Sequence, residues 1–323
     1  MVKSVLGITE CAAAGFVVLG LSFSSLLAGC PAGASGAKTS IGPEIVETAE
    51  QSPPLTVRGI ERNRDFYVAS VEAADTGRSQ NEGTIAAPIA IIPHHLLASP
   101  LITNALAGLD RRGTKLVILV SPDHFGQTPQ GLGGFGSIQS WNTPFGIQKG
   151  ITDPNLSARL IDSFPEIDFS DPEAYQIEHG IYGLVPYLAY YYKSIAGDQV
   201  SLLALSLTPS ANFDFARLAV RLCEFFEANG FLSSQIQVII STDFVHHGTP
   251  ETTRHQDDQN LALLRNLTPD NYRQMNNDCR EGLAFALGWL GKDPGFYFLD
   301  NKNSQDFGGP EIEITSYITG YFR

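Results

Sequence analysis

The chain of 323 residues is long enough for one large domain or two modest ones, and its 43% of apolar residues is ordinary for a globular core. With 34 acidic and 21 basic residues, the net charge of −13 argues against non-specific binding to nucleic acid, because phosphate contacts need clustered Lys and Arg. No nucleic-acid partner is therefore expected.

The first thirty residues differ from the rest of the chain. Lys3 is followed by a mostly apolar stretch from Cys11 to Leu27, and then by small residues before Cys30. This order of charge, apolar core and cleavage site is typical of a secretory signal. Leu27-Ala28-Gly29-Cys30 also matches the bacterial lipobox, whose cysteine becomes the lipidated first residue of the mature protein. We predict a lipoprotein signal peptide at 1–30 and an exported protein anchored to a bacterial membrane through lipidated Cys30. The alternative is an uncleaved N-terminal membrane helix.

Lipidation of Cys30 would leave Cys223 and Cys279 as the cysteines of the mature chain. Two cysteines cannot form a disulfide-rich scaffold, but they could pair with each other in an oxidising compartment. Such a bridge would remove both from metal chemistry.

Residues 31–84 are predicted to be a spacer and N-terminal extension. From Pro31 to about Leu55 the sequence is rich in Ala, Gly, Ser, Pro and Glu and has no periodic apolar pattern, which suits a solvated spacer. A short strand is expected at Asp65–Val71. The folded domain is expected to begin near Ile85 and to occupy 85–323.

Strand and helix patterns then alternate along the chain. Apolar or β-rich runs predict strands at Ile89–Ile92, Lys115–Val120, Val200–Leu207, Gln235–Ser241, Phe296–Leu299 and Ile314–Phe322. Helical spacing predicts helices at Pro100–Leu109, Asn155–Ser163, Ile181–Ser194, Phe213–Asn229, Gln259–Asn266 and Asn271–Leu290. The alternation predicts one α/β domain with a mainly parallel central sheet flanked by helices.

Six of the seven histidines lie in four short motifs, and three of these motifs follow a predicted strand. The four motifs are Pro93-His94-His95, Pro122-Asp123-His124, Asp243-Phe244-Val245-His246-His247 and Glu178-His179-Gly180. In an open α/β sheet the strand ends converge on one crevice, where imidazoles can gather around Zn, Cu, Fe or Ni. Adjacent side chains of an extended chain point to opposite faces, so one member of each His-His pair is expected to face the site. The pattern predicts a metal site.

The segment Asp278-Cys279-Arg280 lies at or just inside a predicted helix. Cys279 could be a small buried apolar residue. A nearby helix N-terminus or Arg280 would instead lower the pKa of its thiol and favour the thiolate that metals bind.

The order of these motifs resembles that of the Memo family, also called AmmeMemoRadiSam system protein B, which is similar in fold to the class III extradiol dioxygenases. The matching stretches are Ile91-Ile92-Pro93-His94, Ser121-Pro122-Asp123-His124, Trp141-Asn142-Thr143-Pro144-Phe145-Gly146, Glu178-His179-Gly180-Ile181 with Pro186-Tyr187, Ser241-Thr242-Asp243-Phe244-Val245-His246, and Asp278-Cys279-Arg280. They extend from about Ile89 to the C-terminus.

The resemblance implies a class III extradiol dioxygenase-like fold in which a metal is bound by His94, His124 and Cys279. The dioxygenase relatives have two histidines and a glutamate in these places. It further implies that His246 is a metal ligand or a catalytic acid-base group beside the metal, and that Asp243 and His179 are catalytic pocket residues.

The resemblance and the histidine pattern favour a metal-dependent oxidoreductase that acts on a small molecule. Two imidazoles and one thiolate leave positions open for O₂ or substrate, and a thiolate favours iron or copper. One alternative is a hydrolase in which zinc activates a water molecule. The other is a non-catalytic metal-binding or interaction protein. Two departures from the usual family pattern would favour it, His95-Leu96-Leu97 after His94 and Phe125 after His124.

Overall fold

The structure is a computed structural model that describes residues 55–56, 64–77, 83–193, 200–291 and 294–323. The predicted signal peptide, Cys30 and most of the predicted spacer lie outside these residues. The chain divides into two units, Met1–Ala49 and Glu50–Arg323, and every described residue belongs to the second.

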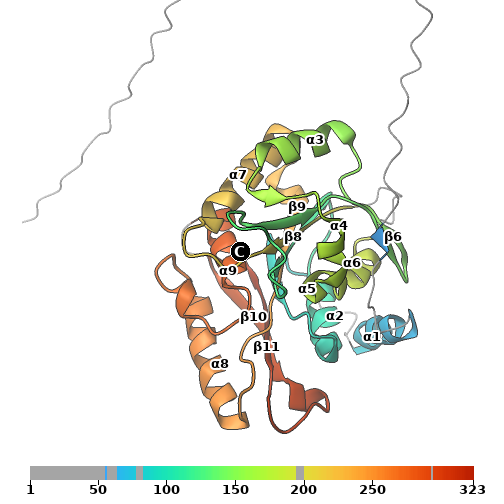
Figure 1. Ribbon diagram of the computed structural model, residues 1–323. Helices are drawn as coiled ribbons and strands as arrows, with labels where there is room; N and C mark the ends of the chain where they lie inside the picture. Colours follow the sequence, from blue (N-terminus) through green and yellow to red (C-terminus); the bar gives the residue numbers. More distant parts are fainter. Residues whose placement is uncertain (1–54, 57–63, 78–82, 194–199, 292–293) are drawn as a thin grey trace, which may run out of the picture. The chain divides into compact units, whose positions relative to one another are not determined.

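A mixed sheet of eight strands forms the centre of the second unit (Figure 1). Its strands, in spatial order, are β10 (Phe296–Asn303), β11 (Ser316–Phe322), β2 (Ile89–Ile92), β9 (Ile236–Ser241), β3 (Leu116–Pro122), β8 (Ser201–Leu207), β4 (Gly134–Ser137) and β7 (Ile167–Asp168). The pairs β2-β9, β9-β3, β3-β8 and β4-β7 are parallel, and the other three are antiparallel. The predicted α/β fold with a mainly parallel sheet is confirmed.

A second sheet is small. It joins β1 (Leu55–Thr56), β5 (Trp141–Thr143) and β6 (Gly146–Gln148).

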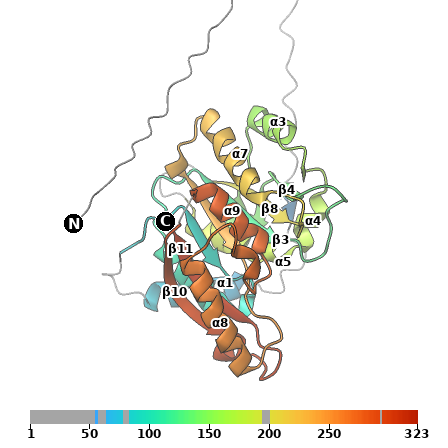
Figure 2. The ribbon, with the colours of Figure 1, turned by 90° about the vertical axis from the view of Figure 1, so that its left-hand side faces the viewer.

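Helices cover both faces of the large sheet, because alternate side chains of each central strand enter two different cores. In β3, for example, Ile118 belongs to one core and Leu119 to the other. The first core contains side chains of α3 (Pro154–Ser163), α7 (Phe215–Ala228) and α9 (Arg280–Leu290), and Figure 2 shows α7 and α9 side by side. The second contains those of α1 (Arg64–Gly77), α2 (Ser99–Gly108) and α6 (Val185–Tyr191).

The remaining helices are α4 (Pro172–Ile177), α5 (His179–Tyr182) and α8 (Pro250–Arg265). Helix α8 packs against β10 and β11.

Six of the seven predicted strands form, within a few residues of the expected bounds. The main correction is the expected strand at Asp65–Val71, which is wrong because this segment lies in helix α1. Tyr67, Val71 and Ala74 are buried at helical spacing, and the Tyr67 ring packs edge-on against Tyr187 at 4.9 Å between centroids.

Three predicted helices have different bounds. The helix expected at Ile181–Ser194 is divided between α5 and α6, with Pro186 in the first turn of α6. Helix α8 begins at Pro250, nine residues before the expected start. The helix expected at Asn271–Leu290 begins only at Arg280, so Cys279 is the residue that precedes it.

None of the helices in the described ranges is both long enough and apolar enough to span a membrane.

Candidate metal centre

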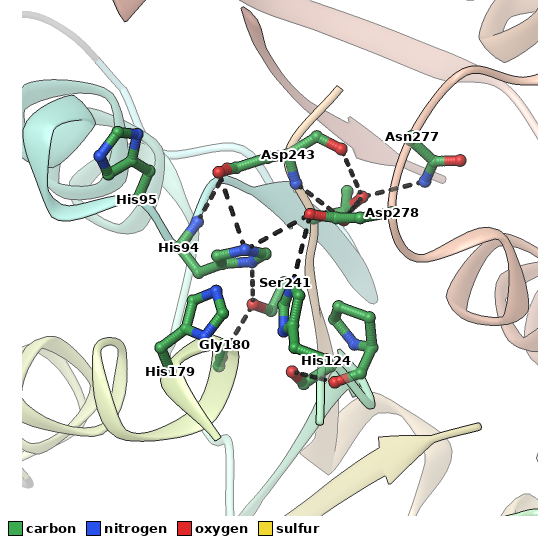
Figure 3. Close-up of polar contacts among 12 residues, drawn as sticks. His94, His95, His124, His179, Gly180, Ser241, Asp243, Asn277 and Asp278 are labelled. Carbon is green, nitrogen blue, oxygen red and sulfur yellow. Dashed lines mark hydrogen bonds and ion pairs between the residues drawn. The ribbon is translucent and has the colours of Figure 1, made fainter. Parts of the chain in front are cut away.

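Three neighbouring parallel strands end at the same edge of the sheet, and each leads into a candidate residue. His94 follows β2, His124 follows β3, and Asp243 and His246 follow β9. Because β9 is hydrogen-bonded between β2 and β3, these carboxyl ends meet. Side chains far apart in the sequence therefore lie together (Figure 3).

A carboxylate oxygen lies at the centre of the histidines. Asp278 Oδ2 is 3.4 Å from His94 Nε2, 3.6 Å from His124 Nε2 and 3.4 Å from His246 Nε2. The other oxygen, Oδ1, accepts a hydrogen bond of 3.0 Å from the backbone N–H of Asp243. This bond to the main chain fixes the direction in which Oδ2 points.

Hydrogen bonds behind the rings of His94 and His124 determine which nitrogen faces the cluster. Ser241 Oγ donates to the Gly180 carbonyl at 2.8 Å, so it accepts from His94 Nδ1 at 3.0 Å. Glu178 Oε1, which as a carboxylate oxygen only accepts, lies 2.7 Å from His124 Nδ1. Both Nδ1 atoms therefore carry hydrogen, and each neutral ring presents its Nε2 lone pair to the cluster.

These groups fit a cation. Within the described part of the chain, neither Asp278 Oδ2 nor His124 Nε2 has a hydrogen-bond partner, although both atoms are buried. Carboxylate oxygens and imidazole lone pairs are all acceptors, so a proton or a metal ion between them is needed to satisfy them.

Two sets of side chains, which share His94, bring all of their ligand atoms within 4.8 Å of one another. They are His94, His124 and His179, and His94, Asp243 and Asp278. The geometry therefore indicates a metal site built from histidine and aspartate.

Protons compete with a metal for two of the rings. Burial lowers the pKa of His124, but its contacts with Asp278 and Glu178 outweigh burial and raise that pKa to about 10. The contact with Asp278 also raises the pKa of His246. Burial dominates at His94, whose pKa falls to about 3, so this ring is neutral. Metal binding at the cluster should therefore release protons.

The two aspartates differ in charge. Burial, and then the charge of Asp278, raises the pKa of Asp243. Burial would also raise the pKa of Asp278, but the surrounding imidazoles, His94 first, hold it well below its usual range. Asp278 is thus the permanent anion of the site, while Asp243 can hold a proton.

His179 lies against the cluster rather than at its centre. Its ring stacks on that of His124, with 3.9 Å between centroids and 30° between planes. The side chain is 39% exposed. The exposed Phe125 ring meets it edge-on at 5.9 Å. These aromatic rings form a partly open wall beside the metal-binding groups.

The structure does not bring Cys279 into the cluster. The side chain is fully buried in the core between α9 and β9, where a Cβ on Gly282 would lie 2.8 Å from its sulfur. Burial raises the pKa of this thiol well above its usual value, which disfavours the thiolate. The adjacent Asp278 occupies the place that the resemblance gave to Cys279. Cys223 and Cys279 are both free, so they form no bridge.

Each His-His pair directs one ring to the cluster. His95 turns away from the cluster (Figure 3). Its Nδ1 forms a 2.6 Å hydrogen bond with Tyr317 Oη. His247 has a left-handed backbone with φ of 57°, which turns the chain after His246. The separation of the two rings at His246-His247 therefore comes from this left-handed turn and not from the alternation of an extended chain.

Three residues at the site were not singled out from the sequence: Glu178, Ser241 and Asp278. Glu178 and Ser241 lie next to or within the recognised motifs, and Asp278 immediately precedes the candidate cysteine. A carboxylate beside a predicted ligand was the available signal for Asp278.

Comparisons with known proteins identify the family of this chain. The chain matches the profile of the family described as Memo-like protein over residues 69–285. A MEMO1 family protein of Sulfurisphaera tokodaii is 26% identical over 250 residues, which cover 72% of this chain and 81% of the relative. A second, of Metallosphaera sedula, is 23% identical over 261 residues, which cover 74% and 84%. MEMO1 family protein TV1383 of Thermoplasma volcanium is 25% identical over 217 residues, which cover 62% and 71%.

Proposed function

Since this chain belongs to the Memo-like protein family, we propose that it is a metal-dependent oxidoreductase acting on a small molecule. In this proposal Fe²⁺ is bound by His94, which both sets of candidate ligands share, and by His124 and Asp278, one from each set. The observation that carries the proposal is the position of Asp278 Oδ2, 3.4 Å and 3.6 Å from the Nε2 atoms of these two histidines. Two imidazoles and one carboxylate form the donor set of non-haem iron oxygenases, which leaves positions open for O₂ and substrate.

The carboxylate changes the choice of metal. A thiolate ligand would favour copper as much as iron, whereas a nitrogen and oxygen donor set favours iron(II) over copper(I). The buried, protonated Cys279 supports the same choice, because it supplies no soft ligand.

Other residues of the cluster would position the substrate and move protons. His246 is suited to exchange a proton with a substrate hydroxyl at Nε2, because its side chain is 40% exposed and Asp278, 3.4 Å away, can stabilise the protonated ring. Asp243 accepts the backbone N–H of His94 at 3.2 Å, which orients the strand end that carries this ligand. His179 would exclude water from one side of His124, on which it stacks.

The experiment is anaerobic loading of the purified protein with Fe²⁺, followed by measurement of O₂ uptake with a panel of small phenolic and catecholic compounds. Substrate-dependent O₂ consumption that is lost in His124→Ala supports the proposal. A protein that binds Fe²⁺ but consumes no O₂ with any compound would contradict the oxidoreductase role.

A zinc-dependent hydrolase is the second candidate, because two histidines, one carboxylate and a water molecule also form a common catalytic zinc site. Ester or amide hydrolysis by the zinc-loaded protein, without O₂ uptake by the iron-loaded form, would select it. A non-catalytic metal-binding role would be selected by tight metal binding with neither activity.

For localisation we retain the sequence prediction and propose that lipidated Cys30 anchors the protein to a bacterial membrane. The lipobox pattern supports this proposal. Cys30→Ser is expected to release the protein from the membrane fraction of cells that produce it, and equal recovery of the variant in that fraction would contradict the anchor.

A further inference from the structure

Glu178 is a fully buried carboxylate whose two oxygens both contact His124. It lies at the start of α5, its exposed fraction is 0%, and Oε2 accepts the backbone N–H of His124 at 2.9 Å. Oε1 lies 2.7 Å from the ring Nδ1 of the same histidine. One side chain therefore holds both the main chain and the ring of His124.

The position of Glu178 is itself fixed. Its Oε1 also accepts the backbone N–H of Gly180 at 2.8 Å. A Cβ at Gly180 would collide with Ser121 Oγ and lie 3.2 Å from Glu178 Oε1, so a glycine here allows α5 to approach β3 closely. Burial of an anion is costly unless hydrogen bonds compensate for it, and three donors surround this one.

The support behind His94 is different. Its Nδ1 faces the hydroxyl of Ser241 at 3.0 Å, which is a neutral acceptor. The Nδ1 of His124 faces an anion at a shorter distance. A carboxylate that accepts from one ring nitrogen increases the electron density on the other, which makes the ring a stronger metal ligand. His124 should therefore depend more on its support than His94 does.

Building on the proposed metal site, we propose that Glu178 is a positioning residue. It keeps hydrogen on His124 Nδ1, holds the ring so that Nε2 faces the metal, and thereby sets the metal affinity of the centre. Nothing in this role requires Glu178 to touch the metal or the substrate.

The test compares Glu178→Gln with the wild type and with Asp257→Asn, all loaded with Co²⁺ alone. Asp257 is also a buried carboxylate, 4% exposed, but it accepts a hydrogen bond from Ser316, and the side chains of Asn301 and Asn260 also act to lower its pKa. The control therefore makes the same change from acid to amide where no histidine ring is held. Both variants are studied as the full chain.

Glu178→Gln is expected to weaken Co²⁺ binding by about 10- to 100-fold, as is typical for residues that support a metal-bound histidine. It should also shift the visible absorption bands of the Co²⁺-saturated protein, because the strength of the His124 ligand changes. The control should leave both properties unchanged. Wild-type affinity and an unshifted spectrum in Glu178→Gln would overturn the inference and leave the proposed metal site standing. Failure of the wild type to bind Co²⁺ would overturn both.

A second measurement is independent of the folding of the variant. In the zinc-loaded wild type, ¹⁵N chemical shifts of the His124 ring are expected to show hydrogen on Nδ1 and metal on Nε2. Metal on Nδ1, or no metal on this ring, would overturn the inference.

Discussion

Asp257, which is buried, and Asp278, whose side chain is 14% exposed, have opposite surroundings. Asp257, in α8, accepts a 2.6 Å hydrogen bond from Ser316 Oγ, and the side chains of Asn301 and Asn260 also act to lower its pKa. Asp278, before α9, directs Oδ2 at the Nε2 atoms of three histidines, and within the described residues this oxygen has no hydrogen-bond partner.

The difference separates a structural polar cluster from a binding site. A carboxylate surrounded by donors is satisfied by the fold itself. A carboxylate oxygen that faces the lone pairs of imidazole nitrogens belongs to a group of hydrogen-bond acceptors. A cation bound between these acceptors can satisfy all of them. The comparison predicts that a metal matters at Asp278 and has no effect at Asp257.

The largest effect is expected at the central oxygen. Asp278→Asn removes the anion while keeping the size of the side chain, and it should weaken Zn²⁺ or Fe²⁺ binding by more than the roughly 100-fold upper range for residues that only support a ligand. Competition with a chromophoric chelator measures this affinity. Cys279→Ala is the matched control on the adjacent residue. If the cysteine variant lost the metal and the aspartate variant kept it, the assignment of the ligands would be reversed.

Metal addition should stabilise the folded protein. A ligand that binds only the native state, at 100 times its Kd, adds about 2.7 kcal/mol to the free energy of unfolding. Thermal unfolding of the wild type with and without Zn²⁺ should show this gain, and chelation should remove it. Asp257→Asn should retain the gain, and Asp278→Asn should lose it. An equal gain in both variants would place the ion elsewhere.

A pH effect is expected at Asp257. Burial raises its pKa from 3.8 to about 6, so ionisation in the folded state costs stability. This cost is absent below about pH 4, grows between pH 4 and 6, and is complete above pH 6. Asp257→Asn, which cannot ionise, should therefore gain about 2 kcal/mol relative to the wild type between pH 4 and pH 8. Urea unfolding at the two pH values measures it. A gain that does not change with pH would show that the charge of Asp257 is not the cause.

The smallest effect concerns Cys279. Cys279→Ala removes a buried sulfur from the core between α9 and β9, and it should cost about 1 kcal/mol of stability with no change in metal affinity. Denaturant unfolding and metal titration on the same preparation test both parts. A loss of metal with unchanged stability would restore Cys279 as a ligand.

The positions of the strands along the chain were largely predictable because buried parallel strands are continuous apolar runs, as in Leu116–Val120. The gathering of His94, His124 and His246 followed from the convergence of strand ends. The prediction of a strand at Asp65–Val71 was wrong, because this segment is helical. The burial of Tyr67, Val71 and Ala74 on one side of the helix depends on contacts with distant residues such as Tyr187.

Residue types alone could not predict that Asp278, and not Cys279, faces the histidine cluster. Adjacent side chains point in different directions, and the choice between them depends on where α9 begins. The helix starts at Arg280, and the backbone before it directs Asp278 into the cluster and Cys279 into the core. Glu178 was missed for a similar reason, because its hydrogen bond to His124 joins residues 54 positions apart.

The most direct measurement is a crystal structure of the zinc-loaded protein, with the ion located by its anomalous scattering. We expect one ion bound by His94 Nε2, His124 Nε2 and a carboxylate oxygen of Asp278, at about 2.0–2.2 Å from each. An ion bound to the sulfur of Cys279, or a cluster that stays free of metal while the ion lies elsewhere, would contradict it.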